Sequence, residues 1–477
     1  MPSKNLSQQL TNRIINYLLW FFFLLNSIYL VYAYPFIPEL QLGNILKING
    51  FTLLIWNLVT FFSALLSTYA IQYLKGFKYH TKFSLLCLGF TITIMIFVMA
   101  NNVFLLLAMW MAMGIFMSQL IGSDSRWEEA KEASRFALKY FVSGSIFLSI
   151  GVLLLAFQLQ DFTLSGITSQ INTVPQQRTF FAALCIIMAA LIQSAIYPFH
   201  RWLLSAMTAP TPASALMHAG FVNGSGILLT LFSTVLVASN TLSILFVIGG
   251  LTAVLAQFTK LLQVNVKQRL ACSTIAQMGF MIMQCGLGFF NAAVVHLILH
   301  GFYKAQLFLS ANEEIGMVKP TKPKNIKTKP WQALLVLLFG MIGAYLFNIL
   351  TGKVIAVNSG IFLTLIVAIT VGQVTHTILK EKSLSSLQKI YLPILLFSIG
   401  IVSYALVYNC ITSLMQSMPM IAAPQSLTTI EIGFGVVFLV GFFIMKLGIY
   451  RKYPHLYMTL LNLSQPAKRT ILLSKSK

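Results

Sequence analysis

Long apolar runs, separated by short polar connections, make up most of the hydropathy pattern of this chain. A helix crosses a bilayer with roughly 20 apolar residues, so the pattern predicts about fourteen membrane-spanning helices. We therefore expect an all-α membrane protein, with residues 1–477 forming a single polytopic bundle. The approximate cores of the predicted spans are 14–34, 51–74, 83–100, 103–121, 137–157, 179–197, 199–238 (a broken helix), 242–264, 268–286, 290–311, 331–350, 358–379, 388–412 and 430–449.

The stretch Gln193–Leu231 differs from a simple span because it is rich in proline and glycine. Proline removes a backbone donor, and freed backbone groups are tolerated in a bilayer only where protein or water satisfies them. We expect a broken helix beside a pathway inside the protein, with His200 and His218 on either side of the break. A kinked packing helix with two hydrogen-bonded histidines is the alternative. The residues expected to mark the break are Pro198, Pro210, Pro212 and Gly224.

A second signal is a row of ionisable residues in one span, His296, His300 and Lys304. Each step of four residues turns a helix by only about 40°, so the three side chains share one face. Histidine titrates near neutral pH, and a buried lysine loses its proton readily. The pattern favours a proton relay, because ionisable groups at membrane depth are costly. A structural hydrogen-bonded stripe, with Lys304 reaching the interface, is the alternative.

Other polar residues of the spans carry weaker signals. Lys260 follows an apolar run, and we interpret it as an anchor that reaches the cytoplasmic surface. Glu431 begins the last span and is expected at the outer interface. Residues 312–330 are predicted to be a cytoplasmic linker between two halves of the bundle, and residues 450–477 a basic cytoplasmic tail.

Composition agrees with a membrane protein: 57% of the residues are hydrophobic and only 9% are charged. The formal net charge of +22 does not indicate nucleic-acid binding, because the basic residues lie mostly in short connections. Their placement predicts that both termini are cytoplasmic. The connections on the opposite side carry only Lys47, Arg178 and Lys353.

Motifs of covalent chemistry are missing from the sequence. We find no phosphate loop, no zinc-ligand cluster and no nucleophilic triad, so we expect that this chain is not an enzyme and holds no cofactor. Five cysteines are scattered through apolar segments without a CxxC pair, and we interpret them as buried, inert thiols. They are Cys87, Cys185, Cys272, Cys285 and Cys410.

Three motifs together carry a family resemblance: SAxxPFHxWLxxAMxxPTPxSALxHA, KxxLAxSTxxQMGF and HxxxHxxYKAxLFL. Over residues 80–315 the chain resembles the proton-translocating, antiporter-like subunits of respiratory complex I. These are relatives of NADH dehydrogenase chain 5 or chain L and are shared with multisubunit sodium/proton antiporters. The resemblance implies an antiporter-like fold, with 80–315 as the conducting core. It also implies an ion path through His218, His296, His300, Lys304 and Lys267, with Gln193 and His200 nearby.

Finer features are similar to the DabB family, the membrane subunits of two-component inorganic carbon pumps. They are Ile192-Gln193-Ser194, Ala215–Gly226, Ala276–Gly288 and His300–Asn312. This resemblance implies a bacterial inner-membrane location and a large DabA-like partner on the cytoplasmic side. The partner would contain zinc, resemble a β-carbonic anhydrase, and couple cation flow to one-way hydration of carbon dioxide to bicarbonate.

Three positions depart from the respiratory pattern. The glutamate of a W-E-G-x-G segment is replaced at Met111, and the lysine before SAxxP is replaced by Gln193. No equivalent of the later K-D-E motif occurs near Gly343–Ile349. A glutamate–lysine pair normally tunes the lysine, so its loss favours a simpler path of histidines, Lys304 and water. A subunit of a respiratory dehydrogenase or sodium/proton antiporter, and a membrane anchor that only recruits an enzyme, are the competing hypotheses.

Overall fold

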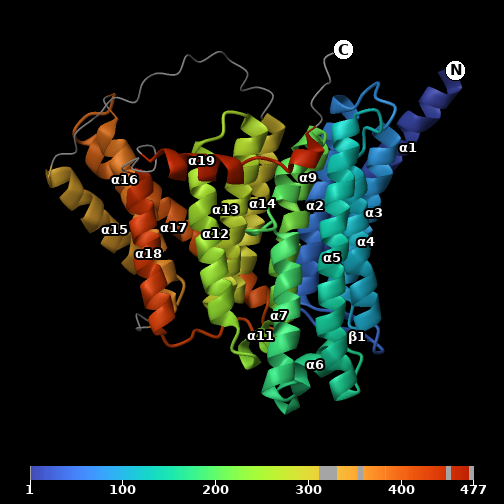
Figure 1. Cartoon of the computed structure of the whole chain (residues 1–477), viewed down its shortest axis with the longest axis horizontal. Coiled ribbons are helices and arrows are strands. Elements are labelled where there is room, and N and C mark those ends of the chain that lie inside the picture. The colour runs from blue at the N-terminus through green and yellow to red at the C-terminus, as the bar shows by residue number, and fades with distance from the viewer. Residues whose placement is uncertain (1, 311–329, 353–357, 382, 447–452, 472–477) are drawn as a thin grey trace.

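The structure is a computed structural model, and it describes residues 2–310, 330–352, 358–381, 383–446 and 453–471. Helices form nearly all of the bundle. Most of the long helices run roughly perpendicular to its longest dimension, from top to bottom in Figure 1. Strands β1 (Leu40–Leu42) and β2 (Leu46–Ile48) form a small antiparallel hairpin at one edge. The predicted linker 312–330 lies outside the described residues except for Pro330, where a helix begins.

The first half of the bundle contains six long helices and two short ones. The long helices are α1 (Pro2–Ala33), α2 (Gly50–Tyr73), α3 (His80–Met99), α4 (Val103–Ile121), α5 (Glu128–Leu159) and α7 (Gln176–Gln193). The short α6 (Leu164–Gln170) and η1 (Ile171–Thr173) connect α5 to α7. Asparagine caps two of the long helices, because Asn49 and Asn102 accept hydrogen bonds from backbone amides of the first turn.

The next span is interrupted and consists of short pieces. They are α8 (Arg201–Ser205), η2 (Ala206–Thr208), α9 (Thr211–Ala219), η3 (Phe221–Asn223), α10 (Gly224–Leu231) and α11 (Ser233–Ala238). Residues Thr211–Leu231 together are long and apolar enough to cross a membrane, and 94% of that window is buried inside the protein. The broken span therefore lies at the centre of the bundle, away from lipid.

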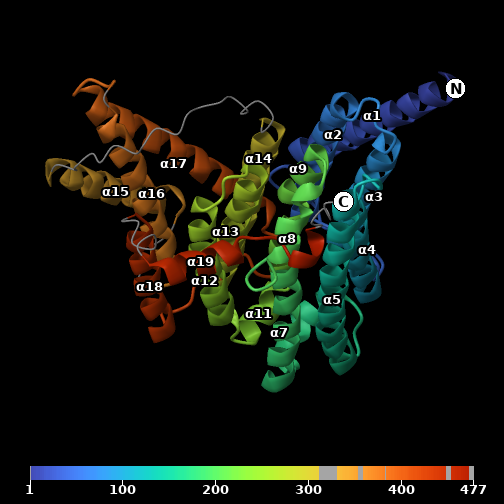
Figure 2. The ribbon, with the colours of Figure 1, turned by 45° about the horizontal axis from the view of Figure 1, so that its top comes forward.

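The remaining chain continues with long helices and ends in short ones. They are α12 (Leu242–Leu261), α13 (Val266–Gly286), α14 (Phe290–Ser310), α15 (Pro330–Leu350), α16 (Gly360–Lys380), α17 (Gln388–Leu414), α18 (Thr429–Lys446), α19 (Pro454–Leu463) and η5 (Lys468–Thr470). Figures 1 and 2 show α15–α18 on one side of the bundle and α1–α5 on the other, with α12–α14 between them.

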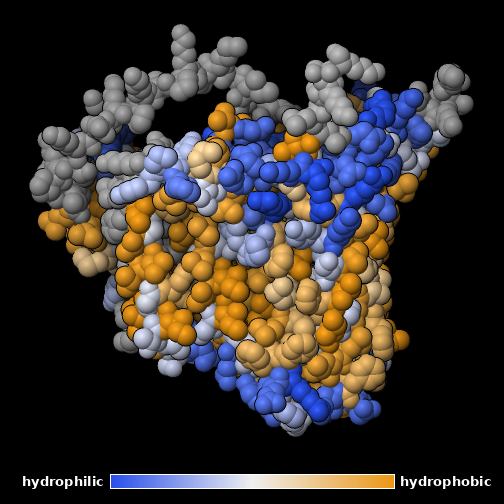
Figure 3. Space-filling view, in the orientation of Figure 1, coloured by the Kyte–Doolittle hydropathy of each residue, from blue (hydrophilic) through white to orange (hydrophobic). Residues whose placement is uncertain are grey.

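Within the described residues, eleven helices are long and apolar enough to span a membrane. The three other predicted spans coincide with α13, α15 and α18. On the face drawn in Figure 3, an apolar band crosses the middle of the molecule, with hydrophilic surfaces above and below it. The chain is thus a multi-pass membrane protein. The start of α1 and the short helix α19 lie at the same edge of the bundle (Figure 1).

The prediction for one cysteine is wrong, and the structure adds detail to two other predicted segments. Cys410 is exposed, whereas the other four cysteines are buried, because it lies on the outward face of α17. Glu431 is buried, and its carboxylate accepts a hydrogen bond from the Thr428 amide while the Thr428 hydroxyl accepts one from the Glu431 amide. It therefore forms a capping box at the start of α18. The predicted tail is partly folded, because α19 and η5 pack on the bundle and bury Leu460 and Thr470.

Close packing of α14 against α9 depends on Gly301. A Cβ atom at this position would lie 2.8 Å from the Phe62 ring and 3.1 Å from the carbonyl oxygen of Ala219. Small residues allow membrane helices to approach in this way. The contact matters for the candidate site, because Gly301 directly follows His300.

We expect the substitution Gly301→Val to force α14 away from α9 and to lower the free energy of unfolding by ~1–3 kcal/mol. The measurement is thermal and denaturant unfolding of the purified protein in detergent. The matched control is Gly433→Val, because nothing lies within 4 Å of a Cβ at that exposed position. Equal stability of the two variants would contradict the role given to Gly301.

Candidate functional site

The interruption of the broken span lies at η3, between α9 and α10. There Gln193 Nε2 donates a hydrogen bond to the carbonyl oxygen of Phe221 (3.3 Å), and Ser194 Oγ donates one to that of Val222 (2.6 Å). Both donors come from the end of α7 and are buried. The carbonyl group of Phe221 also accepts from the Gly224 amide, so the end of α7 adds side-chain partners to two carbonyl groups at the interruption.

Asn223 ties the same interruption to α14. Its amide nitrogen Nδ2 donates to the carbonyl oxygen of Ala219 at 2.7 Å and to that of Leu297 at 3.2 Å. Leu297 directly follows His296 in α14. The helix break is therefore held in fixed register with the predicted row of ionisable residues.

The prolines lie at interruptions of the span that precede α9, as predicted, but they do not produce the further break at η3. Pro198 lies in the connection between α7 and α8, Pro210 precedes α9, and Pro212 lies in the first turn of α9. Proline is tolerated in the first turn, where its missing N–H would have no helical partner. The break follows Gly220 instead, and Gly224 begins the next helical segment.

The predicted row on α14 exists as one face of that helix. The ring centroids of His296 and His300 are 6.1 Å apart, and the ring planes differ by 16°. Lys304 is fully buried, His300 is 5% exposed, and His296 is half-buried. Lys304 Nζ donates a hydrogen bond to the carbonyl oxygen of Leu270 in α13, at 3.1 Å.

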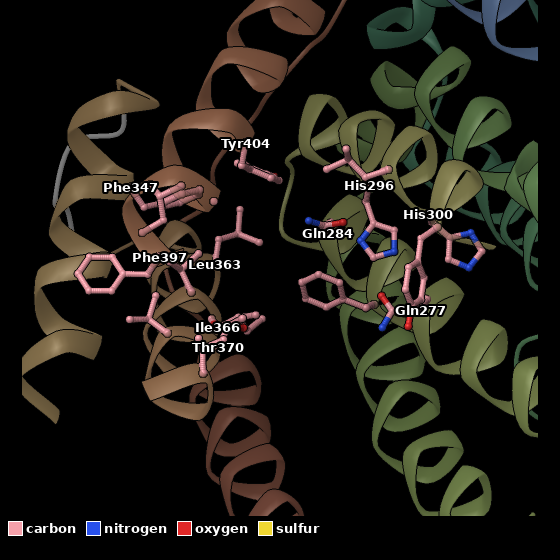
Figure 4. A pocket seen from close by; sticks show the side chains of 18 of the residues that line it. Gln277, Gln284, His296, His300, Phe347, Leu363, Ile366, Thr370, Phe397 and Tyr404 are labelled. Carbon is pink, nitrogen blue, oxygen red and sulfur yellow. Dashed lines mark hydrogen bonds between the residues drawn. The ribbon is translucent and has the colours of Figure 1, made fainter. Parts of the chain in front are cut away.

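His296 and His300 line a cavity of about 730 Å³ between two groups of helices. One wall comes from α13 and α14 and the other from α15, α16 and α17 (Figure 4). Most of the lining is apolar, but Gln277, Gln284 and Tyr404 add polar groups. Since a volume of about 10–15 Å³ is enough for a water, the cavity has ample room for water beside both histidines.

Two further cavities extend from this one towards the end of α12. A cavity of about 490 Å³ shares the lining residues Gln277 and Thr370 with the first, and it also contacts Lys260. Lys260 in turn lines a third cavity of about 160 Å³, together with Arg269 and Leu270. The third cavity therefore reaches the residue whose carbonyl group binds Lys304.

Several ring nitrogens of these histidines have no hydrogen-bond partner in the described part of the chain. They are both nitrogens of His218, both of His300, and Nε2 of His296. Buried polar atoms in proteins nearly always bond to protein or to ordered water. The histidines are therefore suited to bind water, which a fully satisfied structural stripe would not need. The described part of the chain contains four salt bridges, and none of them involves these histidines.

His218 lies on α9, beside α14 but outside the three cavities. Its ring stacks on Phe308 with a centroid distance of 4.5 Å and an angle of 16° between the planes. Phe308 is one helical turn beyond Lys304 on α14. The structure thus brings His218 to the same helix as the row, next to its lysine end.

His200 and Lys267 line none of the three cavities, and their place in the ion path stays a prediction. His200 Nε2 pairs with the carbonyl oxygen of Leu463 at 2.8 Å, and its ring lies 3.9 Å from that of Tyr197. Lys267 begins α13, as predicted near a helix end, and donates to the carbonyl oxygen of Ala209 at 3.0 Å. Both side chains hold the connection between α7 and α9 in place.

The sequence analysis missed several polar residues of the cavities. Lys260 was interpreted as an interface anchor, yet it lines two of the three cavities. Gln277 and Gln284 were not singled out, although their spacing of seven residues places them on one face of a helix. Tyr404 carries no charge and gave no signal on its own.

Residues 100–327 match the family model described as "NADH:quinone oxidoreductase/Mrp antiporter, TM". Over these residues the chain is similar to that antiporter family. The glutamate and the lysine of the respiratory members, named above, correspond to Met111 and Gln193 in this chain. Both positions are therefore uncharged here. Gly224 packs beside the second of these positions, where a Cβ atom would be 3.6 Å from Gln193 Nε2 and 3.4 Å from Met113 of α4.

Relatives of two kinds are similar in sequence. The "Probable inorganic carbon transporter subunit DabB" of Bacillus anthracis is 34% identical over 60% of this chain and 57% of its own length. The "Probable inorganic carbon transporter subunit DabB1" of Halothiobacillus neapolitanus is 35% identical over 53% of this chain and 46% of its own length. The "NADH-ubiquinone oxidoreductase chain 5" of Cryptococcus neoformans is 32% identical over 53% and 38%. The matches thus span about half the length of these curated relatives, or less.

Two solved structures share the fold over 96% of this chain. The Mrp complex from Dietzia sp. DQ12-45-1b gives a TM-score of 0.62 at 19% identity, with 56% of the matched chain covered. The membrane-bound sulfane sulfur reductase, an archaeal respiratory membrane complex, gives 0.58 at 18% identity, with 94% covered. The predicted antiporter-like fold is therefore confirmed.

We expect Gln193→Leu to remove the hydrogen bond from α7 to the carbonyl group of Phe221, which then keeps only the Gly224 amide, and to lower the free energy of unfolding by ~0.5–1.5 kcal/mol. Unfolding of the purified protein measures this loss. Gln306→Leu is the matched control, because Gln306 is an exposed glutamine on α14. If the control is equally destabilised, satisfaction of the helix break is not the reason.

Proposed function

We propose that this chain is the proton-conducting membrane subunit of an energy-coupled inorganic carbon transporter. The observation that carries the proposal is the α14 row, in which His296 and His300 line a cavity and Lys304 is buried beside them. The similarity to DabB subunits supports the choice of inorganic carbon over other cargoes.

The conducting path would use side chains and water in alternation. A proton taken up by His296 would pass to His300, whose ring lies 6.1 Å away, through water in the shared cavity. Imidazole suits this step because it accepts a proton on one nitrogen while it donates from the other. From His300 the row continues to Lys304 and the carbonyl group of Leu270, and then to the cavity lined by Lys260 and Arg269.

The chemistry of carbon dioxide would belong to a partner. We propose a large, zinc-containing, carbonic-anhydrase-like protein on the cytoplasmic side, where both termini of this chain would also lie. In this chain no group of three His, Cys, Asp or Glu side chains is positioned to hold a metal, as far as the described residues extend. Inward proton flow through the membrane subunit would drive the partner to hydrate carbon dioxide in one direction. The setting we propose is a bacterial inner membrane.

We expect His300→Ala and Lys304→Ala to lower proton flux into liposomes that contain the purified protein by about tenfold or more, since a barrier raised by about 1.4 kcal/mol has that effect. An internal pH dye with an imposed membrane potential measures the flux. The matched control is His455→Ala, because His455 is exposed on α19. Wild-type protein that moves only sodium ions, or no ion, would overturn the proposed proton conduction.

Uptake of labelled inorganic carbon by cells should require this chain together with its partner and should collapse when a protonophore is added. The physical reason is that only the proton gradient would supply energy for one-way hydration. Uptake that survives the protonophore contradicts the coupling. Uptake that persists in His300→Ala cells indicates a membrane anchor, and loss of NADH–quinone activity or salt tolerance on deletion indicates a respiratory or antiporter subunit.

A further inference from the structure

A row of hydroxyl groups on α17 continues from the cavity beyond His296. Tyr404, Tyr408 and Thr412 are spaced by four residues and therefore share one face of the helix. The rings of Tyr404 and Tyr408 are stacked, with centroids 6.2 Å apart and an angle of 22° between the planes. Thr412 lies two residues before α17 ends at Leu414 and is partly exposed.

Asn291 links this row to α14. Its amide nitrogen Nδ2 donates to the hydroxyl oxygen of Tyr408 at 2.9 Å and to that of Thr412 at 3.1 Å. Its carbonyl oxygen Oδ1 accepts from the amide of Ala292 at 2.8 Å. Both amide hydrogens are thus donated to hydroxyl oxygens, so the hydrogen of each hydroxyl serves a different acceptor. This arrangement orients the hydroxyl groups of Tyr408 and Thr412.

Tyr404 connects the row to the histidines, because it lines the same 730 Å³ cavity as His296 and His300 (Figure 4). Asn291 lies five residues before His296 on α14, about one and a half helical turns. Lys304 lies on the other side of His296, towards the end of α14 where Ser310 stands. Polar groups therefore extend from His296 in both directions along the bundle.

From this geometry we infer that Asn291, Tyr404, Tyr408 and Thr412 form the outer arm of the proton path. The arm carries protons between the surface at the end of α17 and His296. This inference rests on the proposed function and adds the half of the path that the histidines and Lys304 leave open. A hydroxyl group both donates and accepts, so a row of hydroxyls and water passes a proton without a fixed charge.

A purely structural role for these residues is the competing explanation, because Asn291 also joins α14 to α17. Two readouts separate the roles. Removal of a hydroxyl from a tyrosine keeps the ring and its packing, so a structural contact would lower stability but not flux. The second readout is whether position 412 is accessible to a reagent from the outer surface. A proton path needs this access, whereas a purely structural contact does not.

The first experiment is proton flux into liposomes for the double variant Tyr404→Phe, Tyr408→Phe. We expect flux to fall by about tenfold or more, whereas Tyr391→Phe, at an exposed position of the same helix, keeps wild-type flux. Normal flux in the double variant, alongside loss in His300→Ala, overturns the outer arm and leaves the proposed function intact. Absence of flux in the wild-type protein overturns both.

The second experiment keeps the inference testable if the double variant does not fold. A membrane-impermeant thiol reagent is added from the outer side to the Thr412→Cys variant in a Cys410→Ser background. We expect the reagent to block flux in this variant. The wild-type protein supplies the control, because Cys410 is exposed on another face of α17 and its modification should leave flux unchanged. A thiol at position 412 that reacts without loss of flux, or does not react, contradicts the arm.

Discussion

The requirement that every backbone polar group inside a bilayer has a partner governs the centre of this molecule. The interruption between α9 and α10 leaves backbone carbonyl groups without their usual α-helical partners. Side chains of specific neighbouring residues donate hydrogen bonds to these carbonyl groups. Gln193 and Ser194 reach across from α7, while Asn223 reaches back to Ala219 and across to Leu297. The break is therefore a junction of three helices, and it sets the register of α14 against α9. The position of His296 and His300 beside their cavity follows from that register.

A second constraint is the cost of burying charge, which shapes the chemistry of the row. A buried ammonium group is expensive unless a carboxylate or good hydrogen bonds compensate it. Here the described surroundings of Lys304 supply a backbone carbonyl group, and the family's glutamate and lysine positions are occupied by Met111 and Gln193. Removing both members of an ion pair avoids the penalty that removing one would cause. The proposed path therefore contains imidazoles, amides, hydroxyls and the Lys304 amine, with Lys260 and Arg269 at its inner end.

How far the sequence predicts this structure depends on the range of the interactions. The spans were predictable because length and apolarity decide membrane insertion locally. The α14 face was predictable from its four-residue spacing. The origin of the break was not, because the prolines fall where helices begin and the break depends on Gly220 and donors from α7. The role of His200 depends on Leu463, which is 263 positions away. Lys260 and Tyr404 become part of the site only when α15–α17 pack beside α13 and α14 to form the cavities.

The folded C-terminal segment packs beside the start of the broken span. Ser205 of α8 accepts hydrogen bonds from the Ala467 amide and from the Thr470 hydroxyl, and the Arg469 guanidinium lies 3.9 Å from the Phe136 ring centroid of α5. This segment therefore crosses the connection that leads from α7 into the broken span. Since α7 also supplies the donors of the break, the C-terminal segment, α8 and the end of α7 form one continuous set of contacts around the broken span.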